Sequence, residues 1–136
     1  MKRRNFLLGL AAVAIPVSTA AMQDERVLGT GTVTATFTGW ERGDYLWARF
    51  QREGSGRRET AMVDDDSIGA FLEAHRARPL RLWIETVRTD LPEAGRTEVR
   101  RVVFVRSGGL SAERWWNGLS PRYRRAWLRR YHEAIE

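Results

Sequence analysis

The sequence predicts a mainly β domain that ends in a helical extension, and three observations support this prediction. Apolar and polar residues alternate along five segments, which is the period of a half-buried strand. One segment between the third and the fourth of these changes to helical spacing. A C-terminal segment then repeats large apolar side chains every fourth residue, which places them on one side of a helix. The expected order is therefore β-β-β-α-β-β, followed by helices.

The first 21 residues are expected to be a signal peptide rather than part of the fold. They comprise a charged start, an apolar run from Phe6 to Val17, and small residues that suit cleavage after Ala20 or Ala21. The apolar run is too short to cross a hydrocarbon core of ~30 Å comfortably as a helix. An uncleaved membrane anchor is the alternative.

The start of this segment, Arg3-Arg4-Asn5-Phe6-Leu7, resembles the twin-arginine export motif. A general secretory signal that carries two arginines is the alternative. Either route predicts a periplasmic or secreted protein. The chain has no cysteine, so no disulfide can hold the exported domain together and its stability must come from its own core.

The remaining chain of about 115 residues is long enough for one domain with one core. Without residues 1–21 it carries 20 arginines against 17 carboxylates. The resulting net charge of +3 is too small to indicate nucleic-acid binding by itself.

The expected strands are Val27–Trp40, Tyr45–Arg52, Arg57–Val63, Pro79–Leu91 and Thr97–Arg106. Asp64, Asp65 and Asp66 precede the helical segment. Carboxylates are favoured where a helix begins, so these residues indicate the start of a helix. The alternation then predicts which side chains fill the interior: Val33, Phe37, Leu46, Phe50, Leu82 and Ile84 from the strands, and Phe71 and Leu72 from the helix.

This order of elements resembles the OB-fold, a five-stranded Greek-key β-barrel with a helix between its third and fourth strands. The resemblance covers residues 27–106 and rests on element order and on the long, glycine-punctuated first strand. It implies an OB-like barrel over residues 22–106. Another small α+β domain or an SH3-like barrel is the alternative.

Residues 107–136 are expected to form a C-terminal helical extension. Ser107-Gly108-Gly109 is interpreted as a hinge, Ser111 as the cap of a short helix to Gly118, and Ser120-Pro121 as the start of a longer one. The longer helix carries the stripe of large side chains noted above. The residues of this stripe are candidates for contact with a partner: Tyr123, Trp127, Tyr131 and Ile135.

The sequence does not indicate catalysis, a cofactor or a metal site. His75 and His132 lie far apart, cysteine is absent, and the serines fall in turns and caps. Helix capping accounts for the three consecutive aspartates, whose spacing also differs from that of a calcium loop. The protein is therefore expected not to be an enzyme.

The stretch GDYLWARF, residues 43–50, would place apolar residues on one strand face and aromatic or cationic residues on the other. The OB-fold resemblance implies a ligand surface on the second and third strands and on the loops that follow the first and fourth. The candidate ligand-binding residues are Trp40, Tyr45, Trp47, Arg49, Arg57, Arg58 and Arg96. Rings interleaved with guanidinium groups suit a sugar chain, single-stranded nucleic acid or an anionic polymer of the cell envelope, and export argues against nucleic acid.

An internal alternative is that the extension covers this aromatic face, with Tyr45 and Trp47 packed against Trp127 or Tyr131. An envelope protein or a membrane surface is a further candidate cover. Three classes of function follow. The first is an exported binding module, the second a structural or assembly protein that interacts through its amphipathic C-terminal helix, and the third an enzyme with an unrecognised site.

Overall fold

The computed structural model describes residues 25–43, 45–91 and 95–136. The expected signal peptide, residues 1–21, lies outside this part of the chain, and so do residues 92–94 between the last two expected strands. The described residues belong to two compact units. Of the described residues, the smaller unit contains 25–26, 88–91 and 95–97, and the larger unit contains the rest.

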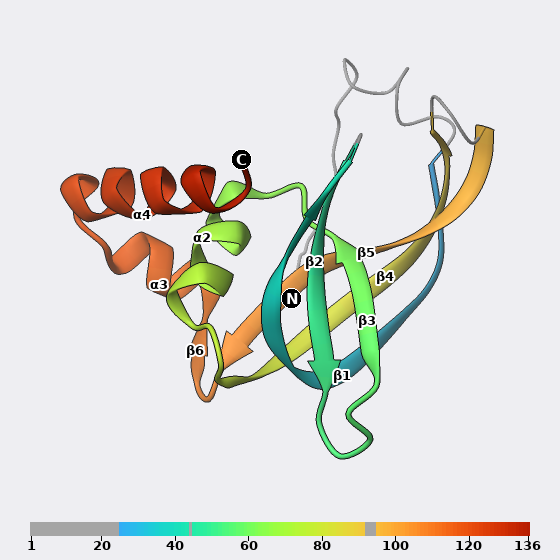
Figure 1. The fold of residues 1–136 in the computed structure, drawn as a ribbon, viewed down its shortest axis with the longest axis horizontal. Helices are drawn as coiled ribbons and strands as arrows, with labels where there is room; N and C mark the ends of the chain where they lie inside the picture. Colours follow the sequence, from blue (N-terminus) through green and yellow to red (C-terminus); the bar gives the residue numbers. More distant parts are fainter. Residues whose placement is uncertain (1–24, 44, 92–94) are drawn as a thin grey trace, which may run out of the picture. The chain divides into compact units, whose positions relative to one another are not determined.

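The fold is mainly β, as the alternation predicted. The strands are β1 (Arg26–Arg42), β2 (Leu46–Arg52), β3 (Arg58–Met62), β4 (Pro79–Leu91), β5 (Gly95–Ser107) and β6 (Leu110–Ser111). They form one sheet in the order β3-β2-β1-β4-β5-β6. A further parallel pairing of β3 with β5, at Met62 and Arg101, closes the strands into a ring (Figure 1).

Three helices accompany the sheet in the described chain: α2 (Asp66–Ala74), α3 (Ala112–Gly118) and α4 (Pro121–Ala134). Each begins where a side chain accepts hydrogen bonds from free backbone N–H groups, the caps being Asp65, Ser111 and Ser120. The predicted helix starts are therefore confirmed. None of the described helices is both long enough and apolar enough to span a membrane.

The segment Ser107-Gly108-Gly109 is not the hinge that the sequence suggested. Gly108 adopts a φ of 58°, a left-handed conformation that glycine accepts readily, and turns the chain back on itself. Ser107 then pairs with Leu110, and Arg106 with Ser111, so that β6 extends the sheet. The extension therefore starts as a strand of the sheet, which the sequence did not predict.

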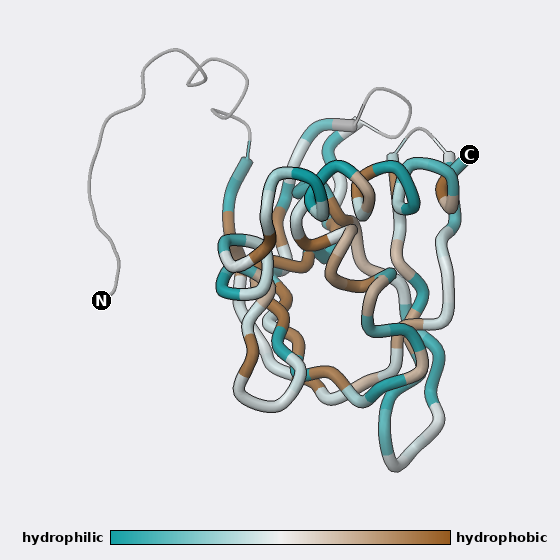
Figure 2. Tube along the Cα trace, turned by 90° about the vertical axis from the view of Figure 1, so that its left-hand side faces the viewer, coloured by the Kyte–Doolittle hydropathy of each residue, from teal (hydrophilic) through white to brown (hydrophobic). Residues whose placement is uncertain are grey.

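The interior of the ring matches the predicted set closely. Phe37, Phe50, Phe71, Leu72, Leu82 and Ile84 are all buried, and Val33 packs against their cluster while remaining partly exposed. Leu46 is the exception: it is the first residue of β2 and is only half-buried, so it lies outside the central cluster. Figure 2 shows hydrophobic segments on the strands, whereas the turn that joins β2 to β3 is hydrophilic.

A β-bulge at Thr38 changes which side chains of β1 face inward. Phe37 pairs with Phe50 and Gly39 pairs with Arg49, so Thr38 has no partner on β2. One extra residue reverses the alternation beyond it. Before the bulge Ala35 and Phe37 point into the ring, and after it Trp40, opposite the buried Ala48, does so.

Candidate functional site

The outer face of the β1-β2-β3 part of the sheet gathers some of the predicted ligand-binding residues. Trp47, Arg49 and Gln51 alternate along β2 and share one face. Their partners on β3 are Met62, Thr60 and Arg58 respectively. Since directly paired residues project to the same side of an antiparallel sheet, Trp47, Arg49 and Arg58 lie on one surface.

A hollow of about 450 Å³ lies on this surface. The residues that line it are Thr38, Arg49, Phe50, Gln51, Arg58, Glu59 and Thr60. Both arginines are exposed and contribute guanidinium donors, while the threonines and the glutamine contribute hydroxyl and amide groups. The arrangement suits a polar ligand that carries negative charge. We call this surface the β2–β3 hollow.

The bulge on β1 positions Arg49 in this hollow. The Thr38 hydroxyl donates to the Arg49 carbonyl at 3.2 Å. The guanidinium of Arg49 lies across Gly39, where an added Cβ would come within 2.8 Å of Nη2. The absence of a side chain at residue 39 therefore allows Arg49 to lie flat against β1.

Tyr45, Trp47 and Arg57 are less tightly grouped than the prediction implied. Tyr45 directly precedes β2 and Trp47 is near its start, and both are half-buried. Arg57 is exposed and directly precedes β3, next to the turn that joins β2 to β3. The two rings and Arg57 therefore lie toward opposite ends of the β2–β3 hairpin.

Trp40 does not lie on the outer face that carries Trp47 and Arg49, so the predicted position of its ring is wrong. The bulge turns its ring inward, where it packs on Phe37 at 4.8 Å and on Tyr131 at 5.3 Å between ring centroids. Its Nε1 donates to Glu73 Oε2 at 2.6 Å. Trp40 thus connects β1 to α2 and α4. Glycine in the middle of a strand, here Gly39, is the sequence signal that could have indicated a bulge.

Arg96 belongs to the smaller unit. Its Nε lies 3.8 Å from Asp90 Oδ1, in an exposed ion pair across the ends of β4 and β5. The structure therefore does not place Arg96 in the β2–β3 hollow.

The extension packs on α2 and Trp40 rather than on the outer face of β2, so the predicted partners of Tyr45 and Trp47 are wrong. Tyr131 is buried against Trp40 and against Gly69 of α2, where any Cβ would overlap its ring. Trp127 packs on Trp115 of α3, at 6.0 Å between ring centroids. The apolar stripe of α4 thus packs largely against other residues of the domain.

The ends of that stripe differ in exposure. Tyr123, at the start of α4, is 61% exposed, whereas Ile135, just after its end, is half-buried. The backbone carbonyl of Ile135 accepts a hydrogen bond from Arg42 Nη1 at 3.3 Å. Of the four predicted partner-contacting residues, only Tyr123 is strongly exposed.

A cluster of three charges inside one end of the ring was not predicted. Glu59 pairs with Phe50 across the strands and so points inward, where it forms ion pairs with Arg52 and with Arg100, the latter at 2.7 Å. Burial raises the pKa of Glu59, but the two guanidinium groups outweigh it and hold the pKa below its usual value. The sequence signal for this cluster was that Glu59 is two residues from the buried Ala61, which places a glutamate on the inward side of β3.

A second unpredicted feature is an aromatic pair on the outside of β4 and β5. Trp83 and Phe104 meet edge to face at 4.9 Å between centroids. The guanidinium groups of Arg81 and Arg106 lie over the Trp83 ring at 5.8 and 5.4 Å. These contacts already occupy the indole, so the pair is interpreted as a stabilising cation–π cluster.

His75, the residue that caps the C-terminal end of α2, has a structural role. The His75 ring is buried, lies 2.8 Å through Nδ1 from the Phe71 carbonyl, and stacks on Phe71 with 4.0 Å between ring centroids. Burial lowers the pKa of His75, and Arg78 lowers it further, against the opposing effect of the backbone hydrogen bond. Within residues 25–43, 45–91 and 95–136, no three His, Asp or Glu side chains are grouped so that they could hold a metal ion.

Comparison with models of known protein families, with curated proteins and with solved structures gave no match. The candidate site consequently rests on the geometry of the β2–β3 hollow.

Proposed function

We propose that this protein is an exported OB-like binding module that holds a polar, anionic ligand in the β2–β3 hollow. The closed strand order β1-β2-β3-β5-β4 and the position of α2 between β3 and β4 support the OB-like part of the proposal. Polymers that carry both carboxylates and hydroxyls, such as acidic saccharide chains of the envelope, match the groups that line the hollow.

The observation that carries the proposal is that two exposed arginines line the same hollow. Arg49 and Arg58 belong to neighbouring strands and face the same side, with Thr60 beside them. A guanidinium group offers donors in a planar fork that fits a carboxylate with two parallel hydrogen bonds. Trp47 lies on the same face of β2, two residues before Arg49, and would offer its aromatic ring for a sugar ring to stack on.

The ligand proposal is tested by titrating the protein with oligogalacturonate, an acidic saccharide, while following tryptophan fluorescence. Oligogalacturonate is expected to bind and neutral maltohexaose is not. Arg49→Gln combined with Arg58→Gln should weaken binding by about a hundredfold or more, because each of the two lost charged hydrogen bonds is worth roughly 1.5–3 kcal/mol.

Arg78→Gln is the matched control, because Arg78 is an exposed arginine that does not line the hollow. It should leave binding unchanged. Equal binding of the acidic and neutral saccharides would contradict the proposal. Preferential binding of oligothymidylate would instead assign the hollow to single-stranded nucleic acid.

Export is the second part of the proposal and rests on the arginine pair near the start of the chain. Replacing Arg3 and Arg4 with lysine keeps the charge but removes the twin-arginine motif. We expect this variant to stay in the cytoplasm when the cell is fractionated. Undiminished periplasmic accumulation would leave only a general secretory signal.

A further inference from the structure

Beyond residue 21, the net positive charge of the chain lies in the C-terminal extension. Residues 22–106 carry 14 arginines and 14 carboxylates, whereas residues 107–136 carry six arginines and three glutamates. The whole net charge of the chain beyond residue 21 thus comes from the extension. Such asymmetry indicates a surface that meets a negatively charged partner.

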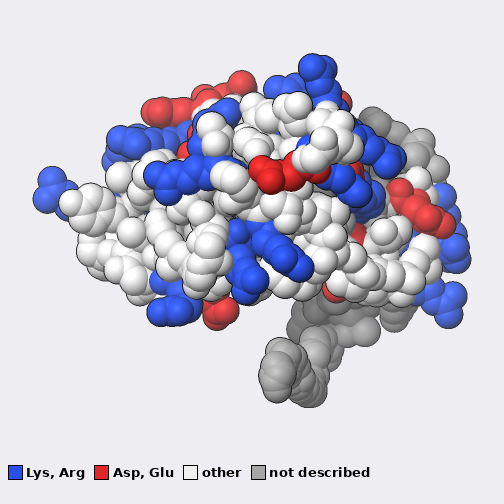
Figure 3. Space-filling view, turned by 90° about the horizontal axis from the view of Figure 1, so that it is seen from below, with Lys and Arg blue, Asp and Glu red and all other residues white. Residues whose placement is uncertain are grey.

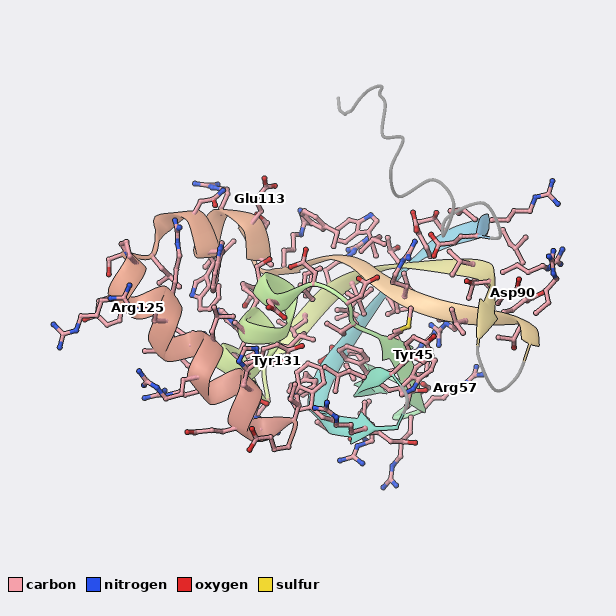
Figure 4. All side chains as sticks on the ribbon, turned by 90° about the horizontal axis from the view of Figure 1, so that it is seen from above. Tyr45, Arg57, Asp90, Glu113, Arg125 and Tyr131 are labelled. Carbon is pink, nitrogen blue, oxygen red and sulfur yellow. The ribbon has the colours of Figure 1, made fainter. Side chains whose placement is uncertain are left out.

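Within the extension, four arginines project from α4 on the sides that do not pack on the domain. At 100° per residue, Arg122, Arg125, Arg129 and Arg130 lie away from the direction of Tyr131. All four are exposed, while Tyr131 is buried. Figure 4 shows Arg125 and Tyr131 projecting from opposite sides of α4, and Figure 3 shows cationic side chains on the part of the larger unit that carries α3 and α4. We call these four residues the α4 arginine face.

These arginines are not neutralised within the described chain. None of the four forms an ion pair there, and Arg130 only lies over the Trp127 ring, at 4.8 Å. Arg124, by contrast, has an internal role, since it donates to the carbonyls of Trp116 and Asn117 at the end of α3, at 3.0 and 3.3 Å. The α4 arginine face therefore remains available for a partner.

We propose that the α4 arginine face docks the protein on the surface of a lipid bilayer that contains anionic headgroups. A guanidinium group binds a phosphate with paired hydrogen bonds, and four of them on one helix match a layer of phosphates. Tyr123 adds an exposed ring beside these cations, and tyrosine favours the boundary between water and lipid. A single helix presents a convex surface. Such a surface can lie against a flat charged layer, whereas binding a polymer chain calls for a groove that surrounds it.

The docking is peripheral, because the apolar side of α4 is already occupied. Tyr131 and Trp127 pack within the domain and are not free to enter the acyl region. The attraction is therefore mainly electrostatic, and it should weaken as salt shortens the range of the charges. This inference is independent of the proposed function, since the β2–β3 hollow contributes none of the four arginines.

The test is sedimentation with vesicles of phosphatidylcholine, with or without phosphatidylglycerol. The full chain and the chain from residue 22 onward are measured in parallel, so that any contribution of the signal segment is separated. Both should sediment with the anionic vesicles and be released by high salt. Arg122→Gln, Arg125→Gln and Arg129→Gln together should lower the partition coefficient roughly a hundredfold, since each arginine near an anionic surface contributes about fivefold.

The matched control is Arg49→Gln, Arg58→Gln and Arg78→Gln together, which removes the same charge from elsewhere. It should sediment as the unmodified chain does, whatever its effect on saccharide binding. Equal sedimentation with neutral and anionic vesicles would overturn the inference, and so would equal losses in the two triple variants. Binding to soluble polyphosphate without binding to anionic vesicles would also overturn it, and would assign the face to a polymer.

Discussion

At the scale of the residue, His75 is a buried titratable group whose effect on stability has a defined sign. Burial lowers its pKa in the folded state, so the unfolded chain binds the additional proton first as pH falls. The stabilisation is present above the unfolded pKa of about 6.5 and is lost as pH decreases toward the folded value. The melting temperature measured by circular dichroism should therefore fall between about pH 7 and about pH 5.

His75→Gln should make the melting temperature less dependent on pH in that range, because glutamine keeps a hydrogen-bond donor but does not titrate. His132→Gln is the matched control, since the side chain of His132 is exposed on α4. Glu59 has a lowered pKa, so its contribution is lost only below about pH 4.5, its ordinary value. If His75→Gln kept the full pH dependence, the buried imidazole would not be its source.

At the scale of the element, the contact that secures the extension is the pair formed by Trp40 of β1 and Tyr131 of α4. Trp40→Ala and Tyr131→Ala should each lower the free energy of unfolding by about 3–5 kcal/mol, as expected for buried aromatic rings. The double variant should lose less than the sum, with a coupling of roughly 0.5–1.5 kcal/mol for the ring pair. Urea denaturation of the four proteins measures this coupling.

The control cycle combines Trp47→Ala with Tyr131→Ala, which is the pairing that the sequence suggested. Trp47 shares no ring contact with the described residues of α4, so its effect should add to that of Tyr131 within about 0.5 kcal/mol. Coupling in this second cycle and additivity in the first would mean that α4 covers the outer face of β2 after all.

The difference between these two pairings shows how far the sequence could predict the site. Alternation identified the strands and the inward positions of β2, which include Phe50, because every second residue of a regular strand shares a face. The bulge at Thr38 breaks that rule for β1, and it moved Trp40 from the predicted ligand surface into the interior. Register across strands brings Arg49 and Arg58 together, and the sequence suggested that grouping through the OB-fold resemblance, since the pattern of a single strand does not contain it.

The helical extension shows the same limit on a larger element. Its caps at Ser111 and Ser120 and the stripe that includes Tyr131 are local patterns, and the sequence predicted them correctly. The surface on which the extension packs was not predictable from these patterns, because an apolar stripe can pack against any apolar surface of the chain. Gly69 decides it: without a side chain there, α2 leaves room for the Tyr131 ring.

At the scale of the whole molecule, the extension is part of the folded domain and not an accessory to it. Ala112 is buried in the central cluster, Trp115 packs edge to face on Phe71 at 5.5 Å between centroids, and Tyr131 lies against Trp40. Truncation after Arg106 removes these contacts and β6 together. The truncated chain would leave the surface of α2 and the Trp40 ring uncovered, and exposed apolar surface of this kind favours aggregation.

We therefore expect the chain truncated after Arg106 to lose its cooperative thermal transition and to elute as aggregate in size-exclusion chromatography. Tyr123→Ser in the intact chain is the control, because that ring is 61% exposed and its loss should change the free energy of unfolding by no more than about 0.5 kcal/mol. A truncated protein that stayed monomeric with an unchanged melting temperature would make residues 107–136 dispensable for the fold. The α4 arginine face would then be carried by an appendage rather than by the domain itself, and the geometry that holds Tyr131 against Gly69 would contribute nothing to stability.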